Sequence, residues 1–166
     1  ITYLNRPTSF TISSEIPPSI FETNSFLIEN KNITLIEYSA FFGSMQIFRY
    51  LMMNKAELKS SLFLYSIHSK NAELIHLIES NVISPTTKSN KSTDNNSYLP
   101  YFIQSIKCHH NDIADYIENN PLIQSEIYSE QREEIISNRL KYLNFTHLES
   151  DIFSEHGFFY SCLYNY

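Results

Sequence analysis

The chain is short of glycine, cysteine and basic residues, and each shortage excludes a class of protein. Only two of its 166 residues are glycine, which favours a helical protein over a fold rich in tight β-turns, where glycine is a preferred residue. The two cysteines, Cys108 and Cys162, are too few for a disulfide framework and lie in helix-forming sequence. We therefore expect free thiols and a cytoplasmic protein.

Basic residues and long apolar runs are also scarce. The chain has 12 lysine and arginine residues against 18 aspartate and glutamate residues, which gives a net charge of −6. It thus lacks the basic surface by which general nucleic-acid binders displace counterions from phosphates. No apolar run approaches the roughly 20 residues that a helix needs to cross a bilayer. The sequence therefore predicts neither nucleic-acid binding nor a membrane span.

What the sequence does contain is a pair of helical patterns joined by a turn. Between Thr34 and Phe42, apolar or small residues recur every three or four positions, which is typical of a helix with one buried face. Thr34 is suited to cap this helix, with Glu37 three residues later at the position of a capping-box carboxylate. Gly43 has the backbone freedom to end the helix, and Met45–Met53 predicts a second one.

The same pattern returns twice along the chain. Residues 38–40 (Tyr-Ser-Ala) align with residues 65–67 (Tyr-Ser-Ile), and residues 39–40 align with residues 105–106 (Ser-Ile). A small serine thus recurs where two neighbouring helices would approach closely. The expected helices are Thr34–Phe42 with Met45–Met53, Ser61–Ser69 with Ala72–Ser80, and Pro100–Cys108 with Asn111–Asn119.

Residues 34–51 fit the repeat pattern T-x-L-x-x-A-A-x-x-G-x-x-E-I-x-x-Y-L. The matching residues are Thr34, Ile36, Ser39, Ala40, Gly43, Gln46, Ile47, Tyr50 and Leu51. The two steps between copies average about 33 residues, the period of ankyrin repeats. In this pattern and in the residue sequence of Ile36–Leu51 and Ser105–Ile117, the chain resembles the ankyrin-repeat family, in particular a divergent ankyrin-like domain expanded in parasitic flagellate protists. It departs from the family where Lys70 and His109 replace the turn glycine.

The resemblance implies an all-α, ankyrin-like solenoid of stacked antiparallel helix pairs with shortened or irregular hairpins between repeats. It also implies a protein–protein interaction scaffold that binds an unidentified protein through the concave face of its first helices, without a cofactor. Because the chain starts at Ile1 without methionine and stops inside a repeat, we expect a segment of a longer protein. We expect a lead-in and N-terminal capping segment over the open end of the first pair (1–33), followed by three helix pairs within 34–120 (34–60, 61–97 and 98–120). After these we expect a helical and irregular connection (121–157) and a truncated fourth repeat (158–166).

The outward positions of the first helices are the candidate binding residues. Their residue types differ from copy to copy, whereas the inward positions stay small or apolar. A varied row on a regular scaffold is what solenoids use as a binding surface. We therefore expect the partner to contact Glu37, Phe41, Leu64, His68 and Lys107. The recurrent Tyr38, Tyr65 and Tyr160 are expected in the core between repeats.

Two other roles stay open. The repeats could be a structural spacer or capping region of a longer multidomain protein, and a remote alternative is a metal- or thiol-dependent enzyme built on Cys108, His109 and His110. Zinc ligands converge on one point, whereas consecutive residues point in different directions, and adjacent Cys108 and His109 cannot face each other as nucleophile and base. We expect no enzyme and no catalytic, cofactor-binding or metal-binding residues. For His110, the resemblance implies a structural hydrogen bond.

Overall fold

The computed structural model describes residues 11–17, 19–83, 98–119, 132–146, 159, 162 and 163. Most of these residues are helical, and one small antiparallel sheet pairs β1 (Glu15–Ile16) with β2 (Ile33–Thr34). The described helices are α1 (Ser25–Glu29), α2 (Leu35–Phe41), α3 (Met45–Met53), α4 (Ser61–Ser69), α5 (Ala72–Ile78), which continues into a π-helical turn at Glu79–Ile83, α6 (Leu99–Lys107), α7 (Asn111–Glu118) and α9 (Arg132–Lys141).

The six helices expected between residues 34 and 119 are confirmed, and no end differs from its predicted position by more than two residues. The capping box at the start of α2 is confirmed as well. The Glu37 backbone N–H donates to Thr34 Oγ1 at 3.4 Å, and the Thr34 backbone N–H donates to the Glu37 carboxylate at 2.9 Å. Residues 84–97, 120–131 and 147–158, which include most of the expected connection, lie outside the described residues.

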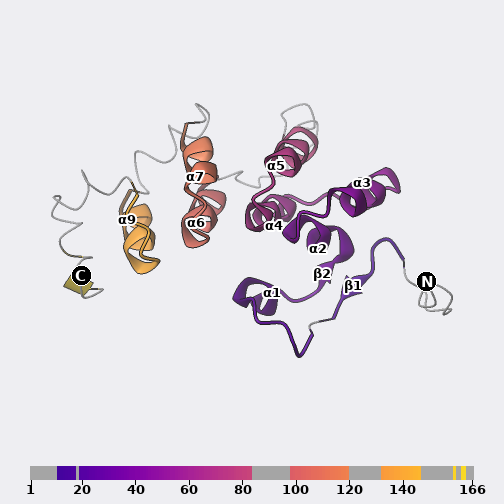
Figure 1. Cartoon of the computed structure of the whole chain (residues 1–166), viewed down its shortest axis with the longest axis horizontal. Helices are drawn as coiled ribbons and strands as arrows, with labels where there is room; N and C mark the ends of the chain where they lie inside the picture. Colours follow the sequence, from indigo (N-terminus) through magenta and orange to yellow (C-terminus); the bar gives the residue numbers. More distant parts are fainter. Residues whose placement is uncertain are drawn as a thin grey trace, which may run out of the picture.

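The helices are arranged in a row that runs from α2 to α9 (Figure 1). Helix α2 packs against α4, α4 against α6, and α6 against α9, while α3, α5 and α7 each pack against the helix that precedes them. We call α2, α4, α6 and α9 the first-helix row. The hydrophobic core runs continuously between these helices, and its fully buried members include Phe48, Phe63, Phe102, Ile67 and Ile106.

Small buried serines allow the helices of this row to approach one another. Ser39, Ser66 and Ser105 are buried on α2, α4 and α6. Each hydroxyl donates to the carbonyl oxygen three residues earlier in its own helix, at 2.7, 2.7 and 2.6 Å. Because the polar group is satisfied within the helix, burying it against a neighbour leaves no hydrogen bond unmade.

Every helix of the row ends in the same left-handed turn. The residues that follow α2, α4, α6 and α9 at this position have φ between 53° and 64°; they are Gly43, Lys70, His109 and Leu143. Only the first is a glycine, for which the left-handed region carries no steric cost. Helix α9, which the sequence predicted as part of a connection, therefore shares both the turn and the packing of the row.

The side chains one residue after the last two of these turns tie neighbouring helices together. The His110 Nδ1–H donates to the carbonyl oxygen of Ile67 at 2.8 Å, which is the structural role that the resemblance implied. The Asn144 amide makes the matching bond from the last turn, donating to the carbonyl oxygen of Ile106 at 3.1 Å. It also donates to the side-chain oxygen of Asn111 at 2.7 Å. The link between α6 and α9 thus repeats the link between α4 and α6.

We expect Gly43→Val to lower the free energy of unfolding by about 2 kcal/mol, because a β-branched residue is strained at φ 64°. A Cβ atom at this position would also lie 3.2 Å from the Ser69 Cβ. The matched variant Lys70→Gly, at φ 53°, should instead gain roughly 0.5–1 kcal/mol by relieving the same strain. Urea titrations followed by circular dichroism test both signs. Equal stabilities of Gly43→Val and wild type would contradict the assigned turn.

We expect Asn144→Ala to cost about 2 kcal/mol, because it removes a buried amide and leaves the Ile106 carbonyl oxygen without this donor. Asn138→Ala is the control. Its amide donates to the Glu134 carbonyl at the helix surface, at 2.8 Å, and the substitution should change stability by less than about 0.5 kcal/mol. Thermal unfolding of both variants gives the comparison. Similar losses in the two would show that the link to α6 contributes little.

Candidate functional site

Three equivalent positions define one face of the first-helix row. Phe41 on α2, His68 on α4 and Lys107 at the end of α6 occupy the same place relative to the turn that follows each helix. We call the surface around them the first-helix face. Helix α1 lies on this side of α2 and α4, away from α3 and α5 (Figure 1). The structure therefore brings the predicted binding positions onto one face, but part of that face is covered.

The predicted outward exposure of Glu37 and Phe41 is wrong. Glu37 is only 7% exposed, because its carboxylate accepts hydrogen bonds from the Thr34 backbone and hydroxyl and from the Ser61 hydroxyl, the last at 2.8 Å. It caps α2 and joins α2 to α4. Phe41 is 8% exposed, because Phe26 of α1 and its own neighbour Phe42 pack against its ring. Both residues hold the fold together.

The remaining predicted residues lie nearer to solvent. Leu64 is half-buried, and Lys107 is exposed, with its ammonium nitrogen 5.3 Å from the centre of the Tyr142 ring. His68 is half-buried in a cluster of aromatic and polar groups. Its ring centre lies 4.3 Å from that of Phe26 and 4.6 Å from that of Phe41.

Helix α1 and its Phe26 were missed by sequence reasoning as part of the site. The N-terminal segment was expected to cover the open end of the first pair. Instead, Phe26 contacts residues of both α2 and α4, so α1 lies across the first-helix face. The available signal was Asn24, whose side chain caps α1 by accepting from the Phe26 N–H at 3.0 Å. That signal predicts a short helix but not where the helix docks.

A cleft of about 550 Å³ opens beside α1. One wall is α1, and the opposite wall is formed by α6 and the chain that follows α9. Its volume falls within the range of ordinary ligand sites, roughly 300–1,000 Å³, and its walls are mainly polar. The lining residues are Asn24, Ser25, Phe26, Glu29, His68, Gln104, Lys107, Cys108, His110 and Tyr142.

The cleft joins Cys108 to His68, a pair that the sequence did not suggest. The Cys108 Sγ lies 3.5 Å from His68 Nδ1, and the Gln104 amide nitrogen lies 3.0 Å from His68 Nε2. Burial lowers the pKa of His68 to about 4, helped by the nearby charge of His110, and burial raises the pKa of the Cys108 thiol. Both groups are thus neutral near pH 7, whereas an activated cysteine needs a lowered thiol pKa.

Two other kinds of site, a metal site and a membrane-spanning helix, have no counterpart in the part of the chain that the structure describes. Within residues 11–17, 19–83, 98–119, 132–146 and the three positions near the C-terminus, no group of three or more His, Cys, Asp or Glu side chains could hold a metal ion. Among the same residues, no helix has the length and apolar character needed to cross a membrane. The larger of the two clefts described, on the first-helix face, is the candidate site.

The lowered pKa of His68 predicts a pH-dependent stability. The imidazole titrates near 6.5 when unfolded and near 4 when folded, so its contribution is complete above about pH 6.5 and is lost as the pH falls towards 4. Allowing for solvent screening, wild type should lose about 1–2 kcal/mol more than His68→Gln over this interval. Unfolding titrations at pH 7 and pH 4.5 measure the difference. A slope in His68→Gln equal to that of wild type would refute the assignment.

Comparisons with known proteins supply no relative from which a role could be transferred. A scan against protein-family models found none that matches the chain, and searches of curated proteins and of solved structures found no match either. The ankyrin resemblance therefore stays a prediction from the sequence, and the functional argument rests on the geometry of the first-helix face.

Proposed function

We propose that this chain is an ankyrin-like solenoid that acts as a protein–protein interaction scaffold and binds its partner through the first-helix face. The support for a solenoid is the recurrence of one unit. A first helix, a left-handed turn and a second helix follow one another at α2–α3, α4–α5 and α6–α7. The bonds from His110 to Ile67 and from Asn144 to Ile106 link successive units in the same way.

The observation that carries the binding proposal is the contrast between the two sides of these helices. On the packed side, Ser39, Ser66 and Ser105 keep one residue type because the helices approach closely there. On the first-helix face, the equivalent positions hold a phenylalanine, a histidine and a lysine, so a regular backbone presents a varied chemistry. Solenoids create extended recognition surfaces in this way.

The open half of the face is the proposed contact surface. Because α1 covers Phe41 and Glu37 is buried, the predicted set narrows to Leu64, His68 and Lys107. The cleft beside α1 adds Gln104 and Tyr142 to these positions. A partner there meets hydrogen-bonding groups, one ammonium and an aromatic ring.

Reversing the charge of Lys107 tests the proposal. We expect Lys107→Glu to reduce the capture of a specific partner by at least about tenfold, the effect of losing roughly 1.4 kcal/mol of contact energy. Lys55→Glu is the matched control, since it makes the same charge change at an exposed position just after α3. Quantitative affinity capture from lysate compares wild type with the two variants. If both variants capture the same proteins as wild type, the repeats act as a spacer or bind elsewhere.

A further inference from the structure

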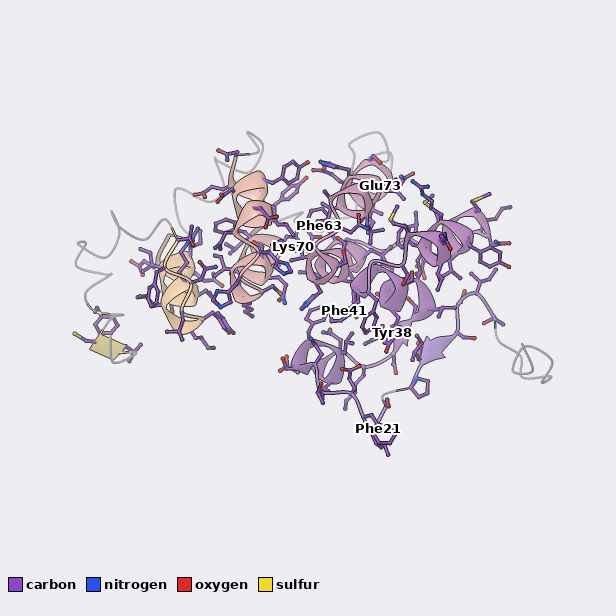
Figure 2. The ribbon with its side chains drawn as sticks, viewed as in Figure 1. Phe21, Tyr38, Phe41, Phe63, Lys70 and Glu73 are labelled. Atoms are coloured by element: carbon purple, nitrogen blue, oxygen red, sulfur yellow. The ribbon has the colours of Figure 1, made fainter. Side chains whose placement is uncertain are left out.

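The segment that carries α1 is a loop with a fixed base. It leaves β1 and returns at β2, whose short ladder pairs Glu15 with Thr34 and Ile16 with Ile33. The tip of the loop stands away from the helices, and Phe21 is 85% exposed there (Figure 2). Two side chains of α1 turn back onto the row. One is Leu27, which is 3% exposed in the main core, and the other is Phe26.

The Phe26 ring occupies a slot made by three other rings. Phe41 lies nearly parallel to it, with ring centres 6.1 Å apart and planes 13° apart. Tyr65 meets it edge to face at 5.1 Å and 77°, and His68 lies against it at 4.3 Å. The contacts with Phe41 and Tyr65 have the distances and orientations at which aromatic rings attract one another beyond simple burial. The slot is therefore shaped for a flat ring rather than for any apolar group.

The slot is formed by the first-helix row alone. Phe41 belongs to α2, whereas Tyr65 and His68 belong to α4, so the slot walls do not depend on the loop that fills the slot. Figure 2 shows Phe41 on the side of α2 that faces α1. The loop meets it through one helix of only five residues, while its ends are held separately by β1 and β2. Undocking α1 would withdraw Phe26 from the slot and Leu27 from the core, whereas the ladder at the base of the loop is a separate contact.

We infer that Phe41, Tyr65 and His68 form a binding slot for an aromatic side chain of a partner peptide, and that Phe26 fills it as an internal ligand. The inference rests on the proposed function and names the chemistry of the partner, which is a short helix with one aromatic residue directed at the slot. Short amphipathic helices dock into grooves by such anchors. The slot is open only in chains whose α1 is undocked. The apparent affinity of a partner is therefore its affinity for the open slot multiplied by the fraction of chains in that state.

Emptying the slot and refilling it with a free ring tests the inference. In Phe26→Ala, the probe N-acetyl-phenylalanine amide should bind, and N-acetyl-leucine amide should bind about three- to tenfold more weakly, since it lacks the ring contacts. The readout is the NMR signal of the His68 imidazole Cε1–H, which a neighbouring ring shifts upfield. Phe41 still lies beside His68 in the variant, so we expect the variant to lose only the part of this shift that Phe26 causes. The phenylalanine probe should restore that part, while wild type stays unchanged at the same concentrations.

A second variant keeps the test decisive if Phe26→Ala folds poorly. Phe26→Leu retains apolar volume in the slot. The phenylalanine probe should therefore bind this variant more weakly than Phe26→Ala but more tightly than wild type. Equal response of all three proteins, equal binding of the two probes, or no ring-current change in either variant would overturn the inference. The NMR readout uses only the chain and a small probe, so it is independent of partner capture. The slot inference can fail while the effect of Lys107→Glu on capture stands, and the capture effect can be absent while the slot binds the probe.

Discussion

The close approach of neighbouring first helices is the constraint on which the rest of the structure depends. Helices can pack at short distance only where the contacting side chains are small, and Ser39, Ser66 and Ser105 provide this at three successive contacts. The approach brings the turns after α6 and α9 within hydrogen-bonding reach of the previous helix, as His110 and Asn144 show. It also aligns the outward positions of adjacent helices, which is why residues far apart in sequence share one face.

Much of the helical framework could be predicted because it follows from local spacing. The apolar periodicity, Thr34 as a cap and Gly43 as a terminator act over a few residues, and the helices formed where these signals placed them. The later turns gave no such signal, because Lys70, His109 and Leu143 adopt a conformation that their residue types disfavour. Tertiary packing selects the turn at those positions and outweighs the local preference.

Helix α9 and the covered site show where sequence reasoning stops. Arg139 stands where the other helices of the row have serine, so the small-residue signal is missing from α9 although it packs on α6. On the first-helix face, helical spacing placed His68 and Lys107 correctly on one side. It could not show that Ser61 would bond Glu37, or that Phe26 would cover Phe41, because both contacts come from other elements.

The short ladder between β1 and β2 has a consequence for selectivity. By holding both ends of the loop, it keeps Phe26 near its slot at an effective concentration that, for short tethers, is in the millimolar range. A competing ring must exceed that local concentration or bind more tightly than one phenylalanine does. Two residue pairs at the base of the loop would therefore set a minimum affinity for competing rings, so that weak aromatic contacts from unfolded or crowded chains do not displace Phe26.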